Sequence, residues 1–218
     1  MNRQKKIDTR QLVVLALMAA LAYAAVAVFR IPVVLFLKYE PKDCLLAIAG
    51  MLYGPLPALL VATVVSLVEM VTISTTGIIG FVMNVLSSAL FVCPAAWLYQ
   101  KKRTLRGALW GLILGALLMS GGMVLWNWLI TPLYMGIPRQ AVVEMLLPAF
   151  LPFNLLKAGL NAALTVLLYK SVVTVLRKAH LTPERGVASQ EKTHRHSWVI
   201  GAVTLVVLAT ALILWRVL

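Results

Sequence analysis

The segment Pro152-Phe153-Asn154-Leu155-Leu156-Lys157-Ala158-Gly159 places a lysine and an amide inside a long apolar stretch of the chain. A charged side chain at membrane depth costs roughly 2.5–3.5 kcal/mol on insertion scales, so such a residue commonly faces a polar cavity. Asn154, Lys157 and Asn161 recur at helical spacing and share one face of a helix. Amides donate and accept hydrogen bonds, whereas an ammonium only donates. This stripe therefore suits a neutral, polar, ring-bearing ligand better than a metal ion.

The composition around this segment is that of an integral membrane protein. Of the 218 residues, 61% are hydrophobic and 12% are charged, whereas soluble domains carry about 25% charged residues. Several apolar stretches reach the ~20 residues that a spanning helix needs. The net charge of +13 does not indicate a nucleic-acid partner, because the basic residues cluster between apolar runs, where the positive-inside rule expects them.

The apolar runs and their breaks predict an all-α fold, a six-helix membrane bundle followed by one additional C-terminal transmembrane helix. The bundle is expected over residues 1–178, a polar linker over 179–197 and the extra helix over 198–218. The second helix has only about ten residues, too few to span a bilayer unaided. The helices are expected at about 9–29, 44–53, 56–73, 78–99, 105–130, 148–176 and 198–218.

The distribution of lysine and arginine predicts the orientation in the membrane. Most basic residues lie before residue 11, at 101–106 and at 170–195, and the positive-inside rule makes these segments cytoplasmic. The N-terminus is therefore expected in the cytoplasm of a multi-pass protein. The two longer connectors, 30–43 and 131–147, are expected outside, above the polar stripe.

Two more amides lie within the predicted helices. Asn127 stands between Trp126 and Trp128. It is either an incidental amide in an interfacial aromatic belt or an amide set beside rings for a flat heteroaromatic ligand. Asn84 is a further polar group at membrane depth and a second candidate for ligand binding.

Glu69 is the acidic residue of the third predicted helix. It is a candidate for the binding site. Alternatively, it pairs with Lys157 and neutralises that charge structurally, because intramembrane charges commonly pair.

Ala16, Ala20 and Ala24 follow one another at four-residue spacing on the first predicted helix. Small residues at this spacing let helix backbones approach closely in lipid. The stripe serves either packing within the chain or docking to another membrane subunit. The glycines of the segment 107–115 repeat in the same way, so the pattern alone does not separate the two.

Catalytic and metal-binding signatures are missing from the sequence. There is no Gly-x-x-x-x-Gly-Lys-Ser/Thr loop, so this chain is not expected to hydrolyse ATP, and neither His-Glu-x-x-His nor Gly-x-Ser-x-Gly occurs. Cys44 and Cys93 lie in apolar segments and are expected to be small core residues rather than a disulfide or a metal pair. No resident cofactor or metal is expected.

The chain resembles the substrate-binding S component of an energy-coupling-factor (ECF) vitamin transporter, in its riboflavin-binding branch. The resemblance runs from about Thr9 to Lys178. It is carried by the alanine-rich first helix, the loop ending in Lys42-Asp43, Leu52-Tyr53-Gly54-Pro55, Gly80-Phe81-Val82-Met83-Asn84, Asn127 with Pro132-Leu133-Tyr134, and Pro152-Phe153-Asn154-Leu155-Leu156-Lys157.

The resemblance implies a role for each of these segments. The positions of Asn127, Asn154 and Lys157 would hydrogen-bond a flavin, and the loop 30–43 would cap the pocket from outside. The alanine stripe would face a transmembrane coupling subunit, and two ATPase subunits would use ATP to drive transport in a bacterial cell membrane. This chain would bind riboflavin and reorient. The seventh predicted helix departs from the family, whose members have six.

Two other functions remain open on the sequence. One keeps the S-component fold and changes the ligand to another vitamin or to a nucleobase-like precursor. The other is a membrane enzyme or a non-transport assembly subunit, which the absence of a catalytic constellation disfavours.

Overall fold

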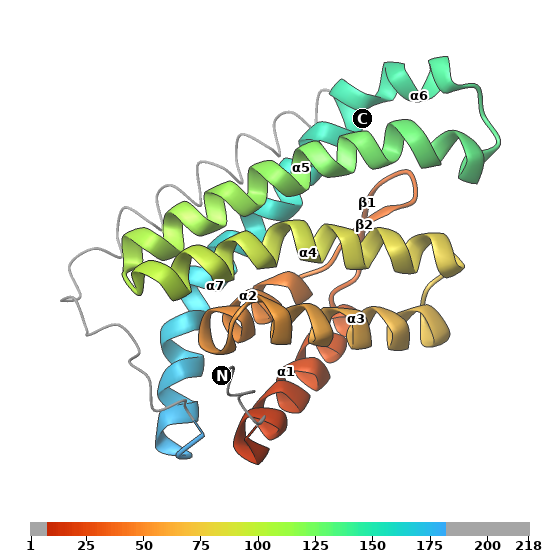
Figure 1. Cartoon of the computed structure of the whole chain (residues 1–218). Helices are drawn as coiled ribbons and strands as arrows, with labels where there is room; N and C mark the ends of the chain where they lie inside the picture. The colour runs from red at the N-terminus through yellow and green to blue at the C-terminus, as the bar shows by residue number, and fades with distance from the viewer. Residues whose placement is uncertain (1–7, 182–218) are drawn as a thin grey trace, which may run out of the picture.

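The computed structural model describes residues 8–181, which form a helical bundle with one short hairpin (Figure 1). The expected helix at 198–218 and nearly all of the expected linker at 179–197 lie outside the described residues. In chain order the elements are α1 (Thr9–Val28), β1 (Ile31–Val34), β2 (Leu37–Tyr39), α2 (Lys42–Tyr53), α3 (Pro55–Thr72), α4 (Gly77–Lys102), α5 (Leu105–Met135), α6 (Arg139–Met145), the π-helical turn η1 (Leu146–Phe150) and α7 (Leu151–Lys178).

The helices identify a multi-pass membrane protein. Within residues 8–181, five helical segments are long and apolar enough to cross a bilayer: α1, α3, α4, α5 and the continuous stretch from α6 to α7. The short α2 has 12 residues, or about 18 Å of helix against a hydrocarbon core of about 30 Å. Nearly all of its residues are buried, so its neighbours rather than lipid surround it.

The ends of the bundle can be assigned from contacts. At one end, the Gln100 amide of α4 donates to the carbonyls of Met51 and Leu52, so α2 and α4 finish side by side. The hairpin, the turn between α3 and α4, and α6 lie at the other end (Figure 1).

Two connectors expected from sequence hold regular structure. The loop 30–43 contains the antiparallel hairpin β1–β2, with an irregularity between Pro32 and Val34. Proline has no N–H to give to a strand ladder, which accounts for the interrupted register. The loop 131–147 is largely helical, because α5 continues through Pro132 to Met135 and α6 follows. Helices in lipid tolerate an internal proline where other groups satisfy the freed carbonyl.

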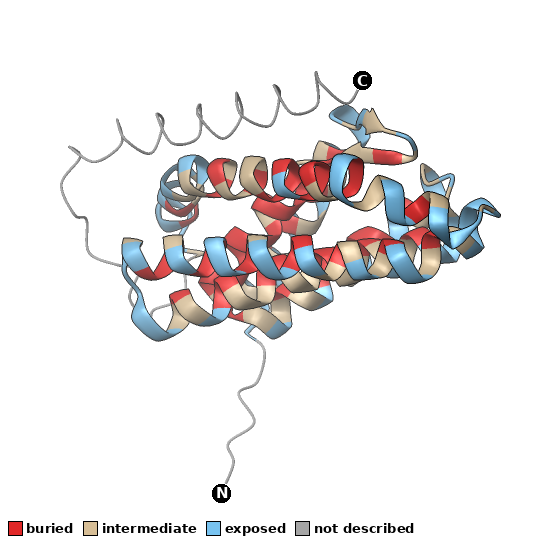
Figure 2. Ribbon diagram, turned by 90° about the horizontal axis from the view of Figure 1, so that it is seen from above, coloured by how far each residue is buried: buried red, intermediate tan, exposed pale blue. Residues whose placement is uncertain are grey.

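The helices bury their facing sides and expose their outer sides (Figure 2). The glycine stripe of α5 serves packing within the chain, since a Cβ at Gly111 would lie 2.9 Å from the Ala95 carbonyl oxygen of α4. A Cβ at Gly115 would collide with the carbonyl oxygen of Phe91, which also lies on α4. Glycine therefore allows the backbones of α4 and α5 to touch.

Helix α1 has two different faces. Val14, Met18, Ala22 and Val26 are buried against the bundle. The stripe Ala16, Ala20 and Ala24 lies away from them and is exposed. Unlike the glycines of α5, these alanines do not serve packing among the described residues.

Candidate functional site

A cavity lies beneath the hairpin, between α4, α5 and α7. The space between its walls amounts to about 510 Å³, which includes open solvent. Phe36, Leu37 and Lys38 of the hairpin border it from above. Its walls bring together four of the residues singled out from sequence: Asn84, Asn127, Asn154 and Lys157.

A second hollow, with about 260 Å³ of space that includes open solvent, adjoins the first, and both are bordered by Phe36, Thr76 and Met83. Trp126 and Tyr134 contribute aromatic rings to it. The Phe36 and Tyr134 rings meet edge to face, with centroids 5.5 Å apart. The polar cavity therefore continues into an aromatic one, which suits a ligand with a flat ring and polar edges.

The turn of the hairpin brings Phe36 to this place. Leu35, just before it, has a φ of 51°, a left-handed conformation that is uncommon for a bulky residue. Phe36 also packs 6.2 Å from the Phe150 ring. The hairpin is thus held on one side by an apolar cluster with α6, η1 and α7, made of Leu37, Val142, Phe150 and Phe153.

The amides that border the cavity are oriented by their own helices. The Asn127 amide donates to the Met123 carbonyl at 2.6 Å, and its oxygen accepts from the Thr131 hydroxyl at 2.9 Å. The Asn154 amide donates to the Phe150 carbonyl at 2.8 Å, where the π-helical turn meets α7. These bonds fix the side-chain rotamers while leaving part of each amide's hydrogen-bonding capacity unused.

Asn161 has a structural role, although it shares a helix face with Asn154 and Lys157. Its amide donates to the Glu40 carbonyl at 3.2 Å, and its oxygen accepts from the Cys44 N–H at 3.1 Å. It therefore holds the chain where the loop enters α2. Asn161 does not border the cavity.

Lys157 is 6% exposed and has a carboxylate close by. Its Nζ lies 3.9 Å from Asp43 Oδ2, while Asp43 Oδ1 accepts a hydrogen bond of 2.5 Å from the Ser88 hydroxyl. A separation of 3.9 Å is an ion pair but is longer than a hydrogen bond. The ammonium is therefore neutralised while its N–H groups stay available to a ligand.

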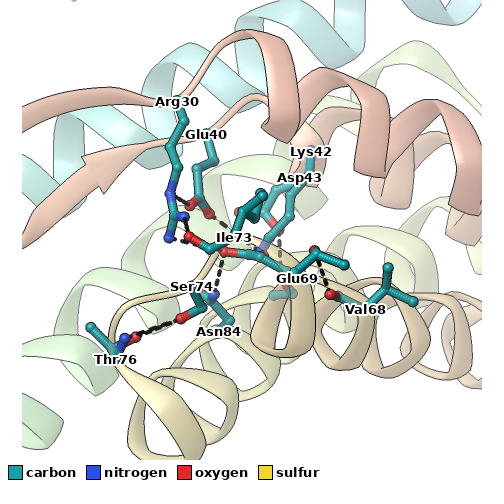
Figure 3. A network of polar contacts seen from close by, with 12 residues as sticks. Arg30, Glu40, Lys42, Asp43, Val68, Glu69, Ile73, Ser74, Thr76 and Asn84 are labelled. Atoms are coloured by element: carbon teal, nitrogen blue, oxygen red, sulfur yellow. Dashed lines mark hydrogen bonds and ion pairs between the residues drawn. The ribbon is translucent and has the colours of Figure 1, made fainter.

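The sequence-based alternative that Glu69 pairs with Lys157 is wrong. Glu69 is fully buried and accepts from Lys42 Nζ at 2.5 Å and from the Asn84 amide at 3.0 Å. Arg30 Nη2 lies 3.4 Å from Glu69 Oε1, the oxygen that also accepts from Asn84 (Figure 3). Glu69 does not border the cavity itself; it orients Asn84, which does.

Arg30, Glu40, Lys42 and Glu69 form one connected set, named here the base network (Figure 3). Glu40 contacts Arg30 Nε at 3.1 Å and Lys42 Nζ at 3.3 Å. Arg30 precedes β1 and Glu40 follows β2, so their contact closes the base of the hairpin. Arg30 also donates to the Ile73 carbonyl at 2.6 Å, which ties the hairpin to the end of α3.

Apart from Lys38, which borders the cavity but is partly exposed, the charges around the cavity balance. Burial by itself would raise the pKa of Glu40, but the neighbouring cations, of which Lys42 acts most strongly, outweigh it and hold that pKa below its ordinary value. With Asp43 and Lys157 added to the base network, three cations face three carboxylates. Buried ions are tolerated when they are paired in this way.

Sequence reasoning missed the base network and Asp43. The charges of 38–43 lie in a connector predicted to be outside, and that prediction gives no sign that Lys42 and Asp43 are fully buried. A usable signal was present. A glutamate at membrane depth, such as Glu69, commonly pairs with a cation. The helix that follows the charged run 38–43 is too short to span the bilayer, so the run can lie inside the bundle rather than at the membrane surface.

Comparisons with known proteins agree with this architecture. A model of the family "ECF transporter, substrate-specific component" matches residues 10–169. Riboflavin transporter FmnP of Bacillus subtilis (strain 168) is 26% identical over 189 residues, covering 80% of this chain and 100% of the relative. Riboflavin transporter RibU of Staphylococcus aureus (strain TCH60) is 25% identical over 189 residues, covering 82% of this chain and 100% of the relative.

A solved structure described as "Structure and mechanism of the S component of a bacterial ECF transporter" has the same fold. It superposes with a TM-score of 0.65 at 24% sequence identity, covering 77% of this chain and 97% of the solved chain. The family match spans most of the chain and includes every wall of the cavity. The chain therefore belongs to the family of ECF transporter substrate-specific components, which bind the substrate of a transporter and are not enzymes.

Proposed function

We propose that this chain is the riboflavin-binding subunit of an ATP-driven ECF importer. Membership of the family implies a vitamin-like ligand and an energising module as partner. The choice of riboflavin rests on the chemistry of the cavity. It also agrees with two relatives named as riboflavin transporters, which are 26% and 25% identical to this chain.

One observation carries the proposal: four polar side chains from three helices converge on a cavity that continues into an aromatic hollow. Riboflavin has a flat ring whose carbonyls and ring N–H alternate as acceptors and donors, and a chain of hydroxyl groups. Amides and an ammonium match such an edge, and aromatic side chains can stack on or pack edge to face against the ring. The buried charges of the site are paired with one another, which favours a neutral ligand over an ion.

Titration of purified protein with riboflavin tests the proposal. In detergent, we expect saturable quenching of flavin fluorescence with one ligand bound per chain, and release of a yellow chromophore on denaturation. A panel of other vitamins and nucleobase-like precursors, added as competitors, serves as the control. Binding of a panel member with no response to riboflavin would assign the chain to another ligand and overturn this proposal.

The proposed transport cycle places the N-terminus in the cytoplasm of a bacterial cell and the hairpin outside. Ligand enters from the hairpin side, and a transmembrane coupling subunit with two ATPase subunits supplies the energy. Its docking surface on this chain is the exposed stripe Ala16, Ala20 and Ala24. This stripe lies on the face of α1 that does not pack on the bundle, so docking there leaves the cavity walls untouched.

Replacing Ala20 by leucine is expected to abolish uptake while leaving riboflavin affinity unchanged. A bulky residue in a small-residue stripe prevents close approach of another helix in lipid. Uptake of labelled riboflavin by cells that carry the variant measures the effect, and affinity in detergent measures the binding. Ala20→Ser, which keeps the side chain small, is the matched control. Wild-type uptake by the leucine variant would exclude this face of α1 as the docking surface.

A further inference from the structure

The hydroxyl of Ser87 is a buried polar group for which the described chain supplies no partner. Ser87 lies on α4 one turn after Asn84, borders the cavity and is 3% exposed. Among residues 8–181, its Oγ makes no hydrogen bond. Threonines elsewhere in this fold donate to the carbonyl four residues earlier, as Thr165 does to Asn161 at 2.7 Å. Ser87 does not form this hydrogen bond to the carbonyl four residues earlier.

The neighbouring residue, Ser88, differs from Ser87 because its hydroxyl has a partner within the protein. Ser88 donates to Asp43 at 2.5 Å, on the side that approaches Lys157. Adjacent residues on a helix are about 100° apart, so Ser87 is turned to a different wall. Ser87 shares its direction with Met83, four residues earlier, and both residues border the cavity.

Two other buried serines also lack partners, and they supply a comparison. Ser66 on α3 and Ser120 on α5 have unbonded hydroxyls, but neither borders the cavity. Among the described residues, Ser87 is thus the serine that combines an unpartnered hydroxyl with a place on the cavity wall. Met83 and Met123 border the same cavity, and their flexible side chains can shift as a ligand reaches the inner wall.

We infer that Ser87 is a ligand-binding residue whose hydroxyl forms a hydrogen bond with a carbonyl or hydroxyl group of the bound vitamin. A hydroxyl both donates and accepts, so it fits either group. The inference rests on the proposed function, because it takes riboflavin as the ligand. It adds a second contact on α4, beside Asn84, to those expected from α5 and α7.

Riboflavin titration of the full-length protein in detergent tests the inference. The Ser87→Ala variant is expected to raise the Kd about two- to tenfold, the usual effect of losing one neutral hydrogen bond. The matched control is Ser120→Ala, which removes an unpartnered buried hydroxyl away from the cavity and is expected to keep the wild-type Kd. Thermal unfolding without ligand is expected to be unchanged in both variants, because neither hydroxyl bonds to the protein.

Lumiflavin, which keeps the ring and lacks the hydroxylated chain, locates the contact. An equal loss of lumiflavin affinity in Ser87→Ala assigns the bond to the ring, and an unchanged lumiflavin affinity assigns it to the chain. A wild-type Kd for riboflavin in Ser87→Ala, or an equal loss in Ser120→Ala, would overturn the inference alone. Absence of riboflavin binding by the wild-type protein would instead overturn the proposed function, and this assignment with it.

Discussion

Replacing Lys157 by methionine is expected to raise the Kd for riboflavin about ten- to hundredfold, because a charge-assisted hydrogen bond contributes about 1.5–3 kcal/mol. The Lys157 ammonium borders the cavity, and its ion pair with Asp43 is too long to occupy an N–H group. Methionine keeps the length and apolar stem of the side chain. Fluorescence titration in detergent measures the loss.

The single variant also leaves the buried Asp43 carboxylate without its nearest cation. A double variant, Lys157→Met with Asp43→Asn, removes both charges, and the asparagine oxygen can still accept from Ser88. We expect this double variant to unfold at or above the wild-type temperature, because no unpaired buried charge remains, and still to bind riboflavin weakly. Full affinity in the double variant would contradict the assignment of Lys157 to the ligand.

Replacing Lys42 by methionine is expected to lower the free energy of unfolding by about 3–5 kcal/mol, the usual cost of breaking a buried ion pair from one side. Lys42 is fully buried and contacts both Glu69 and Glu40. Its removal leaves two carboxylates against Arg30 alone. Thermal and chemical unfolding in detergent measure the change.

Lys38→Met is the matched control for Lys42→Met. Lys38 lies on β2, is partly exposed and forms no ion pair within residues 8–181. The same chemical change there is expected to alter stability by less than about 1 kcal/mol, as for exposed charges generally. Equal losses in the two variants would mean that the base network does not stabilise the fold.

Residue chemistry at membrane depth was sufficient to find four side chains of the cavity walls. Asn84, Asn127, Asn154 and Lys157 stand out because lipid tolerates polar groups only where something satisfies them. The spanning helices were predictable for a similar reason, since a run of ~20 apolar residues has the length needed to cross the hydrocarbon core. Whether these four side chains bind the ligand stays a prediction until variants are measured.

The pairing of charges could not be predicted from the sequence. Arg30, Lys42 and Lys157 are all possible partners for Glu69, and nothing in their spacing separates them. The choice depends on where α2 begins inside the bundle, which buries Lys42 beside Glu69 and Asp43 beside Lys157. Side chains distant in sequence are selected by tertiary packing rather than by local pattern.

The hairpin was missed for a local reason. Its strands have four and three residues, too few for period-two alternation to stand out. Pro32 argues against a strand, although it is tolerated in a short edge strand with a broken register.

The touching backbones of α4 and α5 divide the site into a fixed part and an adjustable part. At Gly111 and Gly115 there is no side chain to act as a spacer, so these two helices behave as one rigid wall that carries Asn84 and Asn127. The hairpin above them has short strands, and it is anchored by ion pairs on one side and apolar contacts on the other. We therefore expect discrimination between ligands to depend mainly on the wall formed by α4 and α5, and the residence time of a bound ligand to depend on the contacts that hold the hairpin.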